Sequence, residues 1–226
     1  MNSAVISRFV QPEYATQESL NTICSNILFT GVDTKRVLLT STSAGDGKSY
    51  VSFHMAWDFA LRGMRVLLMD ADLRRSQLNA KYGIKFEPKS NGLAHFLAGY
   101  SQMDEVIYAI NIDNMYLIPC GRIVSNPIPL FDGERIKNLM GDVKEKFDIV
   151  IIDAPPIGQV IDAAEIARYC DGSVLVVSYN STSRRELLEA KQQMMKTDTP
   201  ILGCIINKVD VDSLIVKKYY YNKSYY

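Results

Sequence analysis

The sequence predicts an α/β protein built on a mostly parallel central sheet with helices on both faces. Short runs of valine, isoleucine and leucine recur along the chain without alternating with polar residues. Such runs are typical of strands that are buried on both faces, as the strands of a parallel sheet are. Segments with apolar residues at helical spacing separate these runs, and this alternation indicates right-handed βαβ units.

The apolar runs give the expected strands, and the segments between them give the expected helices. The strands are expected at residues 36–41, 65–72, 115–119, 147–153, 173–178 and 200–207. The helices are expected at residues 15–29, 48–63, 129–146 and 182–197. The segment 79–114 is less regular, and we expect a helical excursion there that contains "NGLAHFLAG" at residues 91–99.

Length and composition narrow the class of protein. The 226 residues fit one domain with a short appendage. The 25 basic and 25 acidic residues give no net charge, which argues against a dedicated nucleic-acid binder. No run approaches 18 consecutive apolar residues, no signal peptide is evident, and the four cysteines are scattered as reduced thiols usually are. We therefore expect a cytoplasmic protein that binds no nucleic acid.

The first expected strand runs into "TSAGDGKS", which begins at Thr42 and precedes a helix. This is nearly the phosphate-binding loop GxxxxGK[ST], with Thr42 at the first glycine position. Gly45 and Gly47 let backbone N–H groups turn toward an anion, Lys48 supplies a charge for the β- and γ-phosphates, and Ser49 offers a hydroxyl to Mg²⁺. The pattern predicts a P-loop NTPase-like fold that binds ATP and Mg²⁺. The loop residues expected to bind the nucleotide are Ala44, Gly45, Asp46, Gly47, Lys48, Ser49 and Tyr50.

Three carboxylates follow two of the apolar runs. Asp70 and Asp72 end "LLMDAD", and their spacing places both on one side of a continuing strand. The carboxyl end of an open α/β sheet is where ligands bind, so a metal-bound nucleotide is the natural partner of these residues. The alternative is a solvated strand end with Arg74 and Arg75 as counter-ions. Asp153 follows "IVII" in the way that the metal-orienting aspartate of P-loop nucleotidases does.

Together the segments "SAGDGKS", "VLLMDADLRR" and "IVIIDAPP" resemble the Walker A, Walker A′ and Walker B motifs of the bacterial tyrosine kinases (BY-kinases), of the cytoplasmic capsule or exopolysaccharide type. The resemblance covers nearly the whole chain, including "SNPIPLF" and "NGLAHFLAG". It also includes "NKVD", which begins at Asn207, so Asn207 is added to the expected nucleotide-binding residues. The resemblance implies a kinase domain over 1–208 and a flexible tyrosine-rich tail over 209–226.

The resemblance implies an ATP-dependent protein-tyrosine kinase that phosphorylates its own tail, in trans, and regulates capsular or exopolysaccharide synthesis and export. The expected catalytic residues are Lys48, Asp70 and Asp72, with Asp70 accepting the proton of the tyrosine or orienting its hydroxyl. The expected metal-binding residues are Ser49, Asp70, Asp72 and Asp153. The expected phosphorylation sites are Tyr219, Tyr220, Tyr221, Tyr225 and Tyr226.

The terminal segment "VKKYYYNKSYY" supports the kinase interpretation over two others. A packed strand is disfavoured because lysine, asparagine and serine interrupt any apolar face. Stacking on nucleic acid requires a charged groove, which the neutral composition does not suggest. In a chain that holds ATP, a row of phenols is best interpreted as the kinase's own substrate.

The resemblance also implies partners. A transmembrane modulator of the polysaccharide co-polymerase type would activate the kinase with its cytoplasmic tail and hold it at the inner face of the cell membrane, and a cognate tyrosine phosphatase would reverse the reaction. Many members form rings through Glu-x-x-Arg-x-x-Arg. Here Glu18 remains, but Asn21 and Cys24 replace both arginines. This removes two bidentate donors, so we expect a labile homo-oligomer or a monomer.

Two other functions remain open at this stage. The loop alone also admits a MinD/ParA-like partitioning ATPase, whose signature lysine stands five residues before the loop lysine. Here that position is Ser43, which favours the kinase. The other alternative is a nucleotide-dependent scaffold without chemistry, which intact Lys48, Asp70 and Asp153 disfavour.

Overall fold

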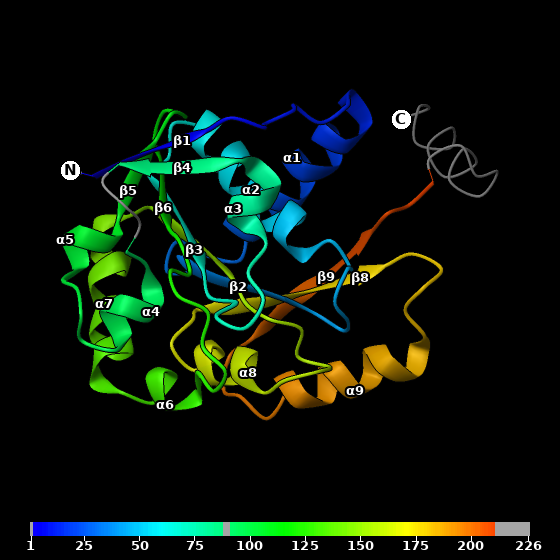
Figure 1. The fold of residues 1–226 in the computed structure, drawn as a ribbon. Helices are drawn as coiled ribbons and strands as arrows, with labels where there is room; N and C mark the ends of the chain where they lie inside the picture. The colour runs from blue at the N-terminus through cyan, green and yellow to red at the C-terminus, as the bar shows by residue number, and fades with distance from the viewer. Residues whose placement is uncertain (1, 88–90, 211–226) are drawn as a thin grey trace.

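The computed structural model describes residues 2–87 and 91–210, and Figure 1 shows their arrangement. Nine strands form one sheet in the order β4-β1-β5-β6-β3-β7-β2-β8-β9. The strands are β1 (Asn2–Ile6), β2 (Arg36–Ser41), β3 (Val66–Asp70), β4 (Ile84–Glu87), β5 (Tyr108–Ile110), β6 (Met115–Ile118), β7 (Ile149–Asp153), β8 (Gly172–Ser178) and β9 (Ile201–Asn207). The helices are α1 (Tyr14–Leu28), α2 (Lys48–Leu61), α3 (Leu78–Tyr82), α4 (Leu93–Leu97), α5 (Met103–Val106), α6 (Ile128–Phe131), α7 (Glu134–Lys146), α8 (Asp162–Ala167) and α9 (Arg184–Met194).

The six predicted strands form the continuous parallel part of the sheet, which confirms the predicted fold class. β6, β3, β7, β2, β8 and β9 are neighbours in this order, and each pair of neighbours is parallel. Every residue of β3 and β7 is buried, as expected for strands without apolar–polar alternation. Because these strands are parallel, their carboxyl ends lie at one edge of the sheet.

The prediction for the segment 79–114 was wrong in part. It contains the short helices α3, α4 and α5, but also the strands β4 and β5. β1, at the N-terminus, was not predicted as a strand either. It lies between β4, to which it is antiparallel, and β5, to which it is parallel. These three strands extend the sheet beyond β6, and β5 pairs with β6 in the antiparallel direction.

Helices cover both faces of the sheet, and two hydrophobic clusters fill the space between the layers (Figure 1). On one face α1, α2 and α3 bury residues such as Leu20, Phe53 and Tyr82. On the other face α4 to α9 bury residues such as Phe131 and Leu139. The helix predicted over 129–146 is interrupted, because α6 ends before Asp132 and α7 begins after Gly133.

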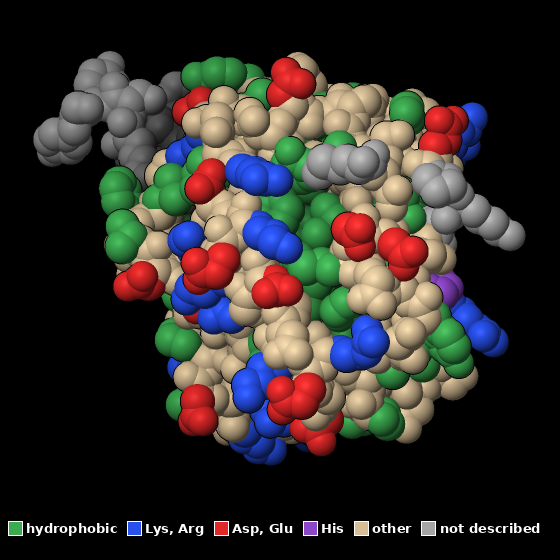
Figure 2. All heavy atoms as spheres, turned by 90° about the vertical axis from the view of Figure 1, so that its left-hand side faces the viewer, with side chains coloured by type: hydrophobic (Ala, Val, Ile, Leu, Met, Phe, Trp, Pro, Cys, Tyr) green, Lys and Arg blue, Asp and Glu red, His purple; other side chains and the backbone are tan. Residues whose placement is uncertain are grey.

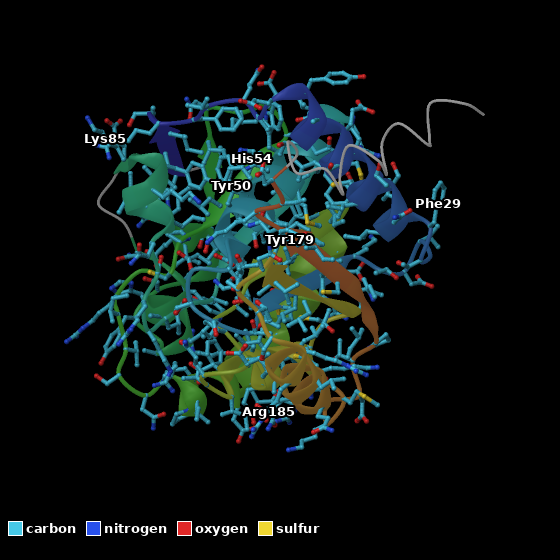
Figure 3. The ribbon with its side chains drawn as sticks, turned by 90° about the vertical axis from the view of Figure 1, so that its right-hand side faces the viewer. Phe29, Tyr50, His54, Lys85, Tyr179 and Arg185 are labelled. Carbon is cyan, nitrogen blue, oxygen red and sulfur yellow. The ribbon has the colours of Figure 1, made fainter. Side chains whose placement is uncertain are left out.

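Asn21 and Cys24, which replace the two arginines of the ring-forming motif, have different environments in α1. Cys24 is fully buried, and its thiol lies 3.9 Å from the backbone oxygen of Met55 in α2. Asn21 is half-buried, and its side-chain amide donates to Glu18 at 3.2 Å. The neighbouring end of α1 carries Phe29, which is 85% exposed and projects from the body of the protein (Figure 3).

The surface of the described residues carries charges of both signs. On the face shown in Figure 2, lysine and arginine side chains alternate with aspartate and glutamate around a hydrophobic hollow. All four cysteines are free. No helix within residues 2–87 and 91–210 has both the length and the apolar character needed to cross a bilayer. Most of the predicted tail, residues 211–226, lies outside the described residues.

Candidate active site

The loop between β2 and α2 has the conformation of a phosphate-binding loop. Gly45 and Gly47 have φ angles of 90° and 89°, in the left-handed region that favours glycine. A side chain at Gly47 would also collide with Asn207, whose Nδ2 donates to the backbone oxygen of Asp46 at 2.9 Å. α2 begins at Lys48, so the loop leads directly into a helix N-terminus, where free N–H groups favour an anion.

The departure from the loop pattern at Thr42 has a structural role. The carboxylate of Asp46 is buried, and its Oδ2 accepts hydrogen bonds from Thr42 Oγ1 and from the backbone N–H of Ser43, both at 2.8 Å. These bonds cross-link the two ends of the loop. They preorganise the backbone around the space where phosphate groups would lie.

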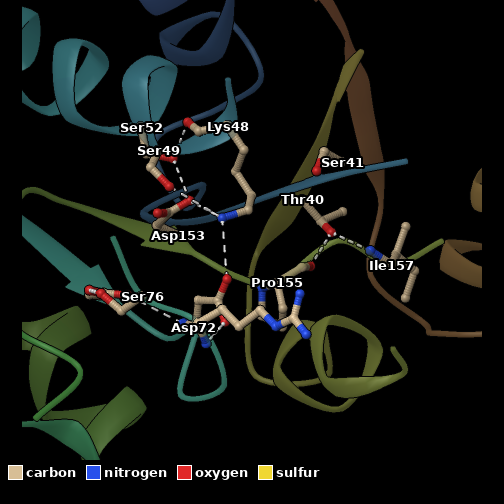
Figure 4. A network of polar contacts seen from close by, with 12 residues as sticks. Thr40, Ser41, Lys48, Ser49, Ser52, Asp72, Ser76, Asp153, Pro155 and Ile157 are labelled. Atoms are coloured by element: carbon tan, nitrogen blue, oxygen red, sulfur yellow. Dashed lines mark hydrogen bonds and ion pairs between the residues drawn. The ribbon is translucent and has the colours of Figure 1, made fainter. Parts of the chain in front are cut away.

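Lys48 lies between two carboxylates (Figure 4). Its Nζ is 2.9 Å from Asp153 Oδ1 and 4.0 Å from Asp72 Oδ2. Burial by itself lowers the pKa of Lys48, but the ion pair with Asp153 and the negative charges of Asp72 and Asp70 outweigh burial, so this pKa lies above its ordinary value. Lys48 is therefore charged, and it can exchange Asp153 for a phosphate group.

Asp70 is the most perturbed carboxyl group of the site. It is 1% exposed and stands beside Asp153 in the register of β3 and β7. Burial, and then the charge of Asp153, raise its pKa from 3.8 to about 7, although a hydrogen bond from Ser76 Oγ opposes the change. A group with this pKa can accept a proton near neutral pH, as a general base must.

Asp72 and the two arginines do not form the solvated strand end considered from the sequence. β3 ends at Asp70, and Asp72 reaches the site from the following loop, where its Oδ1 accepts from the backbone N–H of Arg75 at 2.9 Å. Arg74 instead binds the fully buried Asp162 of α8 through two hydrogen bonds of 2.7 and 3.0 Å. The side chain of Arg74 therefore anchors the loop through Asp162, and within the described residues its ion pair is with Asp162 and not with Asp70 or Asp72.

A cavity of about 1050 Å³ opens above these residues at the carboxyl end of the sheet. Every residue predicted to bind the nucleotide lines it, and so does Asp72. Asp70 and Asp153 are 1% exposed and are not among the lining residues. The structure thus brings together motifs from three separate strands, as the sequence predicted, and the cavity lining extends beyond the phosphate-binding loop.

Several residues near the site were not predicted. Ser52 Oγ lies 3.2 Å from Asp153 Oδ1, and its position one helical turn after Lys48 could have indicated this contact. Lys81, from α3, lines the cavity, and its Nζ lies 4.9 Å from the centre of the Tyr50 ring. No local pattern marks Ser76, which lies in the loop after β3, or Lys81, which lies in the short helix α3.

The donor set fits Mg²⁺ that is bound together with phosphate groups. Within the described part of the chain, no three histidine, cysteine, aspartate or glutamate side chains are arranged to hold a metal ion by themselves. Mg²⁺ in nucleotide sites usually has one or two protein ligands, with phosphate oxygens and water completing the shell. The hydroxyl of Ser49 at the start of α2 and the carboxylate of Asp153 supply such a partial set.

The fold and this loop define a P-loop nucleotide-binding protein. In agreement, the family model described as an AAA domain matches residues 34–183, more than half of the chain. Relatives narrow the class further. Tyrosine-protein kinase CpsD of Streptococcus pneumoniae serotype 4 is 36% identical over 203 residues, which cover 90% of this chain and 87% of CpsD. Tyrosine-protein kinase YwqD of Bacillus subtilis is 34% identical over 199 residues, which cover 87% of this chain and 83% of YwqD.

The chain therefore belongs to the family of bacterial tyrosine-protein kinases that includes CpsD and YwqD, and it is a tyrosine kinase. A solved structure of the chimerical protein CapA2B2 has a TM-score of 0.81 at 26% identity and covers 91% of this chain and 93% of its own. The MinD protein of Pyrococcus horikoshii, solved with Mg-ADP, has a TM-score of 0.67 at 22% identity, covering 79% of this chain and 72% of its own. MinD thus shares the fold, and the comparisons favour the kinase over the partitioning ATPase.

Proposed function

We propose that this kinase binds ATP with Mg²⁺ in the cavity and transfers the γ-phosphoryl group to tyrosines of the terminal cluster. The observation that carries the proposal is the convergence of Lys48, Asp70, Asp72 and Asp153 beneath one cavity at the carboxyl end of the sheet. Phosphoryl transfer requires positioning and charge neutralisation more than covalent chemistry, and this arrangement supplies both.

The nucleotide half of the cavity is made by the loop and the end of β9. The backbone N–H groups of residues 44–49 would bind the phosphates, and Lys48 would leave Asp153 to contact the β- and γ-phosphates. Ser49 would bind Mg²⁺ directly, and Asp153 would hold the ion through water. Asp72 would contribute to the metal site less directly. Bound Mg²⁺ neutralises the charge of the phosphates. Asn207, which contacts the loop, lies where it would meet the nucleoside.

The other half of the cavity suits the acceptor tyrosine. The cavity lining includes the apolar side chains of Ile123, Val124, Pro155, Pro156 and Val160, which would suit an aromatic ring. Asp70, at the end of β3, would accept the proton of the phenol. A phenol has a pKa of about 10, so it needs such help at neutral pH.

The predicted acceptors Tyr219, Tyr220, Tyr221, Tyr225 and Tyr226 lie outside the described residues. The last described residue, Asp210, is three positions beyond Asn207, which lines the cavity. The 16 residues that follow Asp210 would span at most about 55 Å if fully extended. This reach permits entry into the same active site or a neighbour's, and we propose transfer between molecules.

The physiological setting extends the same proposal. We infer that the kinase acts in the cytoplasm at the inner face of the membrane, with a transmembrane modulator that activates it, a tyrosine phosphatase that opposes it, and capsular or exopolysaccharide export as the regulated process. The relatives CpsD and YwqD support the kinase activity in this setting by family membership. The replacement of arginines by Asn21 and the buried Cys24 supports weak self-association.

The direct test is incubation of the purified protein with ATP and Mg²⁺, with and without candidate modulator tails, followed by phosphotyrosine mapping by mass spectrometry. We expect several of the five terminal tyrosines to be modified, in unequal proportions, because they stand close together in the sequence. The proposal is wrong if phosphate appears only outside residues 217–226, or if the protein hydrolyses ATP without labelling any tyrosine under each condition.

A further inference from the structure

Asp70 differs from the other two carboxylates in how it is held. Asp153 has an ion pair with Lys48, and Asp72 lies 4.0 Å from the same amine. The hydrogen bonds that the structure gives Asp70 within the described residues come instead from neutral donors. These are Ser76 Oγ, which binds Oδ2, and the backbone N–H of Asp72, which is 3.3 Å from Oδ1. A buried carboxylate without a direct ion pair depends on such donors for its orientation.

The position of Ser76 is set by a loop that is itself firmly anchored. Arg74 ties the loop to the buried Asp162 through two hydrogen bonds, and its third nitrogen donates to the backbone oxygen of Ser125 at 2.8 Å. The backbone oxygen of Leu73 accepts from the N–H of Val124 at 2.8 Å. Ser76 is half-buried, and its hydroxyl therefore approaches Asp70 from a fixed direction.

The two bonds to Asp70 are unequal. Oδ2 accepts a hydrogen bond from the Ser76 hydroxyl. The backbone nitrogen of Asp72 lies 3.3 Å from Oδ1, which is too long for a strong hydrogen bond. The bond from Ser76 thus occupies one oxygen and leaves the other nearly free. Without it, the side chain could rotate about its Cβ–Cγ bond, because within the described residues Lys48 pairs directly with Asp153 and Asp72 and not with Asp70.

We propose that Ser76 is a positioning residue for phosphoryl transfer. It holds one oxygen of Asp70 within the protein, so that the other faces the phenol of the acceptor tyrosine. The inference rests on the proposed role of Asp70 as the group that accepts the tyrosine proton. It predicts that Ser76 affects the rate of transfer and leaves the binding of nucleotide and Mg²⁺ unchanged, because Ser76 does not line the cavity.

The test compares Ser76→Ala, Ser76→Thr and Asp70→Asn in the full chain, together with the double variant. Initial rates of phosphotyrosine formation are measured against ATP and Mg²⁺ concentration, and ADP binding is measured by calorimetry. We expect Ser76→Ala to lower kcat by about 10- to 100-fold, as removal of an outer partner of an active-site ligand does. The KM for ATP should change less than about twofold, and Ser76→Thr should restore most of the rate because the hydroxyl remains.

Ser101→Ala is the matched control, because the buried Ser101 hydroxyl has no hydrogen-bond partner among the described residues. It should leave kcat unchanged. If Ser76→Ala lowers the melting temperature markedly, Ser76→Cys, which is similar in size but a weak donor, replaces it and should show the same loss of rate.

The double variant tests whether Ser76 acts through Asp70 or independently of it. If Ser76 acts through Asp70, Ser76→Ala should slow Asp70→Asn less than about twofold further. The role of Ser76 alone would be overturned by a normal rate in Ser76→Ala, by a rise in the KM for ATP as large as the fall in kcat, or by full additivity with Asp70→Asn. A normal rate in Asp70→Asn would instead overturn the proposed role of Asp70, and the inference with it.

Discussion

Replacing Asp70 with asparagine should slow catalysis and stabilise the fold. The side chain is 1% exposed, and burial followed by the charge of Asp153 raises its pKa from 3.8 to about 7. Each pKa unit of difference between the folded and unfolded states corresponds to about 1.4 kcal/mol. The rise of about three units therefore destabilises the folded, nucleotide-free protein by about 4 kcal/mol above neutral pH. An asparagine avoids this loss, keeps an oxygen for Ser76, and places an amide beside the Asp153 carboxylate.

The sign of the pH dependence follows from the direction of the pKa change. The folded protein binds the Asp70 proton more tightly than the unfolded chain between pH 3.8 and about 7, so this carboxyl makes the protein less stable as pH rises through that window. Asp70→Asn should therefore exceed the wild type in free energy of unfolding by up to about 4 kcal/mol at pH 8. The difference should shrink steadily as the pH falls toward 5.

Urea unfolding at pH 5, 6.5 and 8, with EDTA and without nucleotide, measures these free energies, and the kinase assay is run in parallel. Phosphotyrosine formation should fall about 10²-fold with ATP binding retained, as expected for the loss of a general base. Asp113→Asn is a matched control, because it makes the same change in an exposed carboxylate between β5 and β6. A variant that is less stable than the wild type by the same amount at each pH would refute the reasoning. Equal loss of ATP binding and of transfer would make Asp70 a metal ligand instead.

Three further predictions concern the ion pair of Lys48, the ion pairs of Asp171 and the terminal tail. Lys48→Met should abolish autophosphorylation, and a wild-type rate of labelling would contradict the site assignment. The variant should also lower the free energy of unfolding by about 3–5 kcal/mol at pH 8, because Asp153 is then buried without its cation. Urea unfolding measures this loss. Asp171→Asn should lower the stability at pH 7 by about 1–3 kcal/mol. Burial raises the pKa of Asp171, but the hydrogen bonds from Arg36 and Lys144 outweigh burial and hold this pKa below its ordinary value. This stability is present above the ordinary pKa and lost only in strong acid, and equal stability of the variant and wild type at pH 7 would argue against it. Lys48→Met protein should be labelled by active enzyme lacking residues 217–226 in a radiolabelled mixture, whereas absence of labelling there, with wild-type labelling independent of dilution, would mean that each tail serves its own site.

The motif residues and the parallel core of the sheet could be predicted from the sequence, because both depend on short-range patterns. A run such as residues 149–153 is apolar throughout, since it is covered on both faces, and no partner has to be known to recognise it. The motifs end such runs, and parallel strands bring their carboxyl ends together. The convergence of Lys48, Asp70 and Asp153 thus followed from the order of the chain alone.

The sheet extension was missed for a physical reason. β5 has three residues and β4 has four, which is too short for a reliable periodic signal. Both pair with β1, which lies between them and is separated from both by about 80 to 100 residues in the chain. Pairing over such distances depends on the packed fold and not on local preference.

The same distinction applies within the site. The sequence by itself determined which residues could bind a nucleotide and that the chain resembles a tyrosine kinase. Only the tertiary structure decided that Arg74 pairs with Asp162, that Cys24 is buried against α2, and that Ser76 supports Asp70. These contacts join side chains from separate elements, or from a loop whose path is set by its anchors. A buried charge takes the partner that packing places within reach, and the spacing of residues along the chain does not specify that partner.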